Sequence, residues 1–206
     1  MDHRPSTTVL LVATTNPGKL REIEGILHGL PIALVTLRDF PGVAEPEETG
    51  ATFAENARLK ALYYAAATRL PSVADDSGLE IDALDGAPGV HSARWHGTDY
   101  AWKFQKIHER LRARGVSTSP ARFVCHVALA DGGRIVHEAS GVVEGRISDE
   151  PRGTNGFGYD PIFFYPPFGC TLAELDSERK SQVSHRGKAF AALRQYLEAN
   201  GGRIAG

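Results

Sequence analysis

Four polar or glycine-rich segments of this sequence carry residue types that could take part in chemistry. The first is the run Thr14-Thr15-Asn16-Pro17-Gly18-Lys19, which follows a short apolar stretch. A glycine-containing loop that leads into a helix presents backbone N–H groups and the positive end of the helix dipole, and both attract an anion such as phosphate. Lys19 adds a full positive charge. An ordinary capped turn is the alternative, because the spacing of the P-loop motif is missing.

The second segment contains two adjacent carboxylates, Asp75 and Asp76, at the expected end of a strand. Neighbouring negative charges repel each other unless a cation or solvent lies close. Mg²⁺ is commonly held by one or two protein carboxylates together with substrate phosphates. Glu47 and Glu48, in an acidic loop, could supply a further oxygen. A solvated turn is the better interpretation of the pair taken alone, but the nearby phosphate-binding candidates reverse that preference.

The third and fourth segments lie in the second half of the chain. Residues 153–161 place Phe157 and Tyr159 among three glycines, so a ligand could approach the backbone closely while a ring offers a flat face to a purine base. A β-bulge with both rings in the core fits equally well. Lys180 and residues 184–188, at a helix start, could hold a phosphate or the edge of a base, or could simply be solvated. The remaining histidines are too isolated to indicate zinc.

The first half of the chain is expected to alternate between strand and helix. Strands are predicted over residues 8–13, 32–37 and 72–74 from their apolar and β-branched runs. A helix follows the Thr14–Lys19 segment, and another begins after Thr52, where Glu55 stands at the capping-box spacing. These strand–loop–helix units would hold the first two segments at strand ends.

The second half is expected to contain a hairpin and two helices. Two strand-like runs, residues 122–130 and 134–143, flank Asp131-Gly132-Gly133, a hairpin signal. Helices are predicted over residues 99–114 and 184–199, the last one ending at Gly201-Gly202. Helix–strand units combined with a central hairpin indicate an α/β fold on a mixed sheet. Several of the 22 glycines and 12 prolines fall inside the four segments. There a missing Cβ is expected to admit phosphate or base close to the backbone.

Composition narrows the class of protein. A chain of 206 residues predicts a single domain over its whole length, 1–206, with two lobes at most. The net charge of −2 argues against extended nucleic-acid contact, although a local basic pocket is possible. No apolar run is long enough to span a membrane, and the first residues do not resemble a secretory signal, so a cytoplasmic protein is expected. Cys125 and Cys170 are expected to be reduced packing residues.

In this order, the four segments resemble the inosine/xanthosine triphosphate pyrophosphatase family. The similarity runs over almost the whole chain. A single short matching block would be weak evidence for the family, whereas several matching blocks in the same order are specific evidence for it. The matching blocks are residues 9–19, 47–50, 52–57, 74–79, 156–161 and 184–187.

The resemblance implies a fold, an activity and an assembly. The expected fold is an elongated α/β subunit with a mixed central β-sheet, whose helices form two lobes around a nucleotide cleft. The expected reaction, with Mg²⁺ as cofactor, is hydrolysis of ITP, dITP and XTP at the α–β phosphoanhydride to the nucleoside monophosphate and pyrophosphate. This keeps deaminated purines out of DNA and RNA. A homodimer is also implied, with neither a nucleic acid nor a membrane as partner.

The resemblance also implies site residues by position. Asp76 is the expected general base and shares the Mg²⁺ site with Glu47. Phe157 to Asp160 would form the platform for the base, and donors from His185 and Arg186 would favour the 6-oxo group of a deaminated purine over the amino group of adenine. The expected substrate-binding residues are Thr14, Thr15, Asn16, Pro17, Gly18, Lys19, Lys60, Ser77, Phe157, Gly158, Tyr159, Asp160, Lys180, His185 and Arg186.

Two other functions remain open at this stage. The chain could be a pyrophosphatase for other modified nucleotides, which a substrate panel would separate. It could instead be a nucleotide-binding sensor that does not turn over. The carboxylates at positions 47, 75 and 76 argue against the sensor, since a passive binder gains little from negative charges beside a triphosphate.

Overall fold

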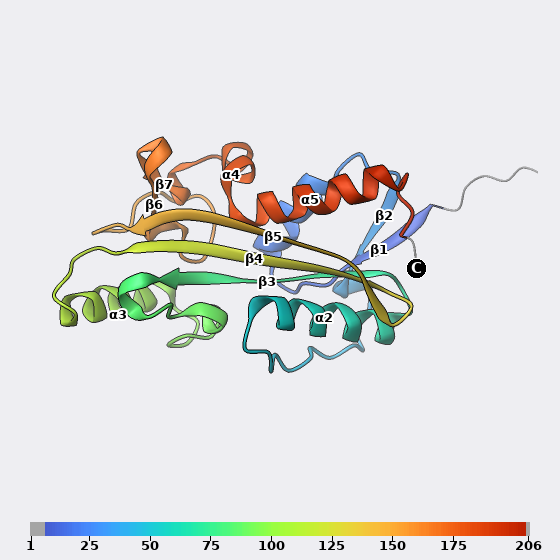
Figure 1. Cartoon of the computed structure of the whole chain (residues 1–206), viewed down its shortest axis with the longest axis horizontal. Helices are drawn as coiled ribbons and strands as arrows, with labels where there is room; N and C mark the ends of the chain where they lie inside the picture. The colour runs from blue at the N-terminus through green and yellow to red at the C-terminus, as the bar shows by residue number, and fades with distance from the viewer. Residues whose placement is uncertain (1–6, 205–206) are drawn as a thin grey trace, which may run out of the picture. The chain divides into compact units, whose positions relative to one another are not determined.

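The computed structural model describes residues 7–204 and shows an α/β fold on one mixed sheet of seven strands (Figure 1). The strand order is β2-β1-β3-β4-β5-β6-β7; β1 pairs in parallel with β2 and β3, while β6 pairs antiparallel with β5 and β7. The predicted α/β class with a mixed sheet is therefore confirmed.

The strands are β1 (Thr8–Val12), β2 (Ile32–Thr36), β3 (Ser72–Ile81), β4 (Pro120–Asp131), β5 (Arg134–Ile147), β6 (Phe163–Tyr165) and β7 (Cys170–Thr171). The α-helices are α1 (Pro17–Leu27), α2 (Phe53–Thr68), α3 (Tyr100–Ala113), α4 (Ser177–Val183) and α5 (His185–Ala199). None of the helices among the described residues has the length and apolar character needed to cross a membrane.

The chain divides into two compact units. Unit 1 contains the described residues up to Asp76 together with residues 126–140 and 189–204, and unit 2 contains residues 77–125 and 141–188. The three long strands β3, β4 and β5 each contribute residues to both units.

In unit 1, α2 covers one face of the strands, and local sequence explains where this helix begins and ends. The Thr52 hydroxyl accepts from the Glu55 N–H at 3.2 Å, and the Glu55 carboxylate accepts from the Thr52 N–H at 3.1 Å, which is the predicted capping box. Arg69 ends the helix in the left-handed conformation, two residues before Pro71. A small-residue stripe of α2 packs on the sheet through a buried core: Leu11, Ala13, Ala57, Ala61, Tyr64, Ala65, Ala74, Ala128 and Ala130.

Unit 2 has a separate core that packs α3 against its strands. The Asp99 carboxylate accepts from the N–H groups of Ala101 and Trp102 and so caps α3. The helix then buries Ile107 and Leu111 against strand residues such as Leu79 and Phe163. The rings of Tyr100 and Phe104 also pack against Tyr159, so α3 lies beside the loop that precedes β6.

The structure corrects the predicted elements at two places. The strand predicted over residues 72–74 runs on to Ile81, so Asp75 and Asp76 lie inside β3 and not at a strand end. Polar residues within a buried strand look like a turn in the sequence, whereas the ladder of neighbouring strands satisfies their backbone groups. The short elements β6, β7 and α4 were not predicted, because each is too brief to show a periodic pattern. The hairpin is confirmed, with Gly132 and Gly133 at φ 55° and 82°.

Cys125 and Cys170 form no disulfide with each other, and Cys125 is buried, which agrees with the predicted packing role.

Candidate functional site

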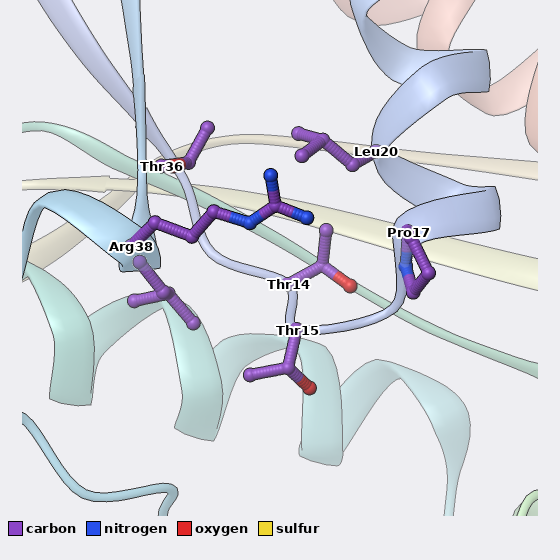
Figure 2. Close-up of a pocket in the computed structure, with 7 residues that line it drawn as sticks. Thr14, Thr15, Pro17, Leu20, Thr36 and Arg38 are labelled. Carbon is purple, nitrogen blue, oxygen red and sulfur yellow. The ribbon is translucent and has the colours of Figure 1, made fainter. Parts of the chain in front are cut away.

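In unit 1, the Thr14–Lys19 segment lines a cavity at the carboxyl ends of β1 and β2 (Figure 2). The cavity is lined by Thr14, Thr15, Pro17, Leu20, Thr36, Leu37 and Arg38. Carboxyl ends of parallel strands are common ligand sites in α/β proteins. The Arg38 side chain extends towards Thr14 and Leu20, so it brings a positive charge beside the predicted phosphate loop. Sequence reasoning missed Arg38, although a basic residue directly after a strand was a signal that could have indicated it.

Asn16 caps the helix that follows this loop. Its side-chain oxygen accepts from the Gly18 N–H at 2.8 Å and from the Lys19 N–H at 3.1 Å, while the Thr14 hydroxyl accepts from the Asn16 N–H at 3.2 Å. The sequence predicted free N–H groups at this helix start. Two of them instead donate to Asn16, because an Asn side chain at this position satisfies the helix's first N–H groups.

The two adjacent aspartates point to different lysines. Lys19, on α1, donates to Asp75 at 2.9 Å, and Lys60, on α2, donates to Asp76 at 3.0 Å. Successive side chains of a strand point to opposite faces of the sheet. Asp75 and Asp76 therefore avoid direct repulsion and each gains its own positive partner.

Both oxygens of the Asp76 carboxylate are held. Lys60 contacts Oδ1, and it also donates to Glu48 at 2.6 Å, while the Asn56 amide donates to Oδ2 at 3.2 Å. Asn56 is in turn held by the Gly50 N–H, which donates to its side-chain oxygen at 2.8 Å. Asn56 was not predicted as a site residue, although it lies one residue after the capping-box Glu55 in a matched block. These contacts fix the orientation of the Asp76 carboxylate.

Burial sets the electrostatics of this cluster. Burial raises the pKa of Asp76 above its ordinary value of 3.8; the positive charges of Lys60 and Lys19 oppose this shift, and the negative charge of Glu48 adds to it. Burial alone would lower the pKa of Lys60, but the charges of Asp76, Asp75 and Glu48 raise it overall. Asp76 is thus a stronger base than an exposed aspartate, and Lys60 stays protonated.

The oxygen ligands of unit 1 fit a Mg²⁺ ion that is partly held by its substrate. No group of three or more His, Cys, Asp and Glu side chains within residues 7–204 lies close enough to hold a metal. Mg²⁺ needs only one or two protein carboxylates when phosphate oxygens and water complete its shell. Asp76 offers a buried carboxylate, and Glu47 lies exposed next to Glu48.

In unit 2, the Phe157 ring lies between two cations. The Lys180 ammonium is 4.6 Å and the Arg186 guanidinium 5.5 Å from the ring centroid. Asp160 holds this arrangement, because one of its oxygens accepts from Lys180 at 2.6 Å and from the Phe157 N–H at 2.8 Å. Lys180 and Asp160 are both buried, so the ion pair is well shielded from solvent. The structure thus brings together four residues that the sequence placed in two separate segments.

Of the other predicted residues, Ser77 joins this group through Arg186, and His185 lies in the same unit. Arg186 donates to the Ser77 hydroxyl at 2.7 Å, and the His185 ring stacks on Phe123 with centroids 4.7 Å apart. Tyr159 is different, since it is buried in the core of unit 2 and donates to the Ser92 carbonyl at 2.9 Å. Of the predicted aromatic platform, the structure leaves Phe157 partly exposed and uses Tyr159 as internal support.

The fold defines an α/β protein with a mixed sheet, and each unit contributes its own cluster of charged side chains. Unit 1 supplies lysines and buried carboxylates, and unit 2 supplies an aromatic ring with two cations. The model of the Ham1 family matches residues 10–196, so the chain belongs to this family.

Named relatives agree with this membership. A dITP/XTP pyrophosphatase of Geobacter sulfurreducens is 50% identical over 192 residues, which cover 92% of this chain and 96% of that protein. A dITP/XTP pyrophosphatase of Thermus thermophilus is 50% identical over 188 residues, 89% of each chain. The solved structure of a HAM1 protein from Coxiella burnetii superposes with a TM-score of 0.87 at 43% identity and covers 94% of this chain and 100% of that one. The family resemblance inferred from the sequence is confirmed.

Proposed function

We propose that this chain hydrolyses the deaminated purine nucleoside triphosphates ITP, dITP and XTP at the α–β phosphoanhydride, giving the nucleoside monophosphate and pyrophosphate. The observation that carries the proposal is the buried Asp76, held at one oxygen by Lys60 and at the other by Asn56. A carboxylate that is oriented and made more basic by burial suits the activation of a water molecule. The names of the curated relatives support the choice of substrate.

The unit 1 cluster would bind the triphosphate. Water attacks a triphosphate slowly because the negative charges repel the nucleophile, so positive charge near the reacting phosphorus lowers the barrier. Lys19 and Lys60 provide this charge, and Arg38 adds a third cation in the cavity beside the Thr14–Lys19 segment. The same lysines pair with Asp75, Asp76 and Glu48, which offsets the free-energy cost of burying these carboxylates.

Asp76 would take the proton of the attacking water. Because burial raises its pKa, its basicity comes closer to that needed at neutral pH. Asp76 and Glu47 would hold Mg²⁺, which supplies positive charge that offsets the charge of the triphosphate and of the departing pyrophosphate. Asn56 would keep the carboxylate from rotating while the proton moves.

The unit 2 cluster would recognise the base. Phe157 offers a ring face with the buried cations Lys180 and Arg186 over it, and His185 is a further buried side chain of the same unit. Hydrogen-bond donors at the base edge suit the 6-oxo group of hypoxanthine or xanthine, whereas the amino group of adenine would leave them unpaired. We expect the kcat/KM values for ITP, dITP and XTP to exceed that for ATP by at least about 100-fold, because adenine lacks the 6-oxo group that would accept these hydrogen bonds.

The family resemblance also supports a homodimer as the working form. Sedimentation or light scattering at micromolar concentration would show twice the monomer mass of 22.3 kDa. A monomer at that concentration would contradict the proposal. The dimer is proposed independently of the reaction, and its absence would leave the chemistry above unaffected.

The decisive experiment measures pyrophosphate release from ITP with Mg²⁺ and with EDTA, and release with ATP or a modified pyrimidine nucleoside triphosphate in place of ITP. Binding of ITP is measured alongside. We expect rapid release only with ITP and Mg²⁺. Binding of ITP without release would favour a sensor, and faster release from a modified pyrimidine nucleotide would favour a pyrophosphatase of different preference. Either result would overturn the proposed function.

A further inference from the structure

Unit 2 contains a lysine that is entirely buried and lies outside all of the matched blocks. Lys103, on α3, has no exposed surface. Its ammonium donates to the carbonyl oxygens of Ala93 at 2.7 Å and Ser92 at 3.2 Å, and it lies 4.3 Å from the centroid of the Tyr100 ring. No carboxylate pairs with Lys103 among residues 7–204. Carbonyl dipoles and ring faces alone compensate its charge.

The Ser92 carbonyl that Lys103 contacts is shared with Tyr159. The Tyr159 hydroxyl donates to the same oxygen at 2.9 Å, and the Lys103 ammonium lies 5.7 Å from the centroid of the Tyr159 ring. The Ser92 hydroxyl accepts from the Leu79 N–H at 2.9 Å and donates to the Gly89 carbonyl at 2.6 Å. Ser92 therefore joins β3, α3 and the loop that carries Tyr159.

Each end of this network leads to a residue of the proposed base site. Leu79 lies two residues after Ser77, whose hydroxyl accepts from Arg186. Tyr159 lies between Phe157, the proposed ring for the base, and Asp160, which holds Lys180 and the Phe157 N–H. A shift of the Ser92 carbonyl would therefore move the Phe157 loop and the strand that carries Ser77.

Stability does not explain why a lysine stands here. Burying an ammonium without a carboxylate costs free energy, and burial also lowers the pKa of Lys103. An apolar side chain of similar length, such as methionine, would fill the same space without that cost. What lysine provides is two directed hydrogen bonds to the segment that supports the base loop.

We propose that Lys103 is a positioning residue for base recognition. Through the Ser92 carbonyl that it shares with Tyr159, it holds the Phe157–Asp160 loop at the spacing that selects a deaminated purine. The inference rests on the proposed function, since it requires that unit 2 binds the base. Lys103 itself touches neither substrate nor metal.

The test compares Lys103→Met with Lys106→Met. Lys106 is on the same helix and lies at the same 4.3 Å from a ring centroid, that of Trp102, but its ammonium pairs with Glu109 near the surface and it has no link to Ser92. For Lys103→Met we expect KM for ITP to rise about tenfold and the ITP/GTP ratio of kcat/KM to fall, as misplaced binding groups cause. At saturating ITP, kcat should stay within about twofold of wild type, because the chemistry of unit 1 is untouched. Lys106→Met should behave as wild type.

Tyr159→Phe provides a second variant that removes only one hydroxyl, so it remains informative if Lys103→Met does not fold. It should raise KM for ITP in the same way. The double variant should raise KM by less than the product of the two single fold-changes, because both residues act on one carbonyl oxygen. Wild-type KM and nucleotide selectivity in Lys103→Met or, should that variant not fold, in Tyr159→Phe would overturn the inference. Failure of the wild-type protein itself to hydrolyse ITP would overturn the proposed function instead.

Discussion

At the scale of single residues, the partners of Asp75 and Asp76 decide what each can do. The two residues are adjacent in sequence, but Asp75 forms an ion pair with Lys19 and Asp76 forms one with Lys60. Asp76 is also held by a neutral amide, that of Asn56, and burial raises its pKa. A base must be oriented and moderately basic, and Asp76 meets both requirements of the proposed role.

Asp76→Asn removes the proposed base while keeping the shape of the side chain. We expect kcat for pyrophosphate release from ITP to fall by about 10²- to 10⁴-fold, the usual contribution of general-base catalysis. Steady-state release at saturating ITP and Mg²⁺ measures this. Asp75→Asn is the matched control and should lose less. Near wild-type turnover in Asp76→Asn would rule out the role.

The raised pKa of Asp76 also predicts how activity depends on pH. A base works only when ionised, so kcat/KM for ITP should fall as pH drops through the pKa of Asp76. Because burial raises that pKa, the acidic limb should lie above 3.8, the ordinary value for an aspartate. A profile of kcat/KM against pH, restricted to pH values where circular dichroism shows the native fold, measures the limb. A limb at or below the ordinary value would contradict the assignment.

Burial of Lys103 predicts that the stability of the folded protein also depends on pH, in the alkaline range. Its pKa is lowered in the folded state from 10.5, so between the lowered value and 10.5 the unfolded chain binds more protons and stability rises with pH. At pH 7 the charged form is buried at a cost. Lys103→Met should therefore melt at the same or a higher temperature than wild type at pH 7. Thermal unfolding of both proteins tests this, and a large loss of stability would show that the lysine is needed for folding.

At the scale of elements, glycines at two helix starts make room for the protein's own atoms. A Cβ on Gly50 would lie 2.6 Å from the side-chain oxygen of Asn56, and one on Gly187 would collide with the Ser181 carbonyl. The sequence predicted that missing Cβ atoms at such positions admit phosphate or base. At Gly50 the missing Cβ instead leaves room for the Asn56 side chain, and at Gly187 it leaves room for the backbone of α4.

Gly50→Ala tests whether the start of α2 orients Asp76. The added methyl group would displace Asn56, which would free one oxygen of the Asp76 carboxylate. We expect kcat/KM for ITP to fall about tenfold, since a small displacement of a catalytic group is enough for such a loss. Gly42→Ala, in the same long loop, has nothing within 4 Å of the added atom and serves as the control. Equal activities of the two variants would contradict the role of Asn56.

At the scale of the whole molecule, the proposed function assigns a different part of the substrate to each unit. Unit 1 contains the lysines and carboxylates that suit a triphosphate with its metal, and unit 2 contains the ring and cations that suit a base. The strand β3 carries residues of both, with Asp76 as the last residue of unit 1 and Ser77 as the first of unit 2. Substitutions in unit 2 should therefore act mainly on KM and selectivity, and those around Asp76 mainly on kcat.

Much of the secondary structure could be predicted from the sequence, because helix caps, turns and apolar stripes depend on local patterns. The capping box of Thr52 and Glu55, the Gly132-Gly133 turn and the stripe of α2 follow from residues a few positions apart. Motif spacing was enough to identify the family and to name Asp76, Lys19, Lys60 and Lys180. The cap, the turn and the apolar stripe follow from side-chain and backbone chemistry within a few residues, so no tertiary contact is needed to predict them.

Only the tertiary structure decided which groups face one another. That Asp75 and Asp76 point to opposite faces depends on β3 continuing past them, and this requires neighbouring strands whose hydrogen bonds are far away in sequence. In the sequence, Tyr159 looks like a platform residue and Lys103 like a surface residue of a helix. In the structure both are buried, and both donate to the Ser92 carbonyl. Local periodicity along the chain predicted the elements, and the matched blocks indicated the family. Burial and long-range pairing arise from the whole fold, so contacts between distant segments decided which candidate side chains lie together.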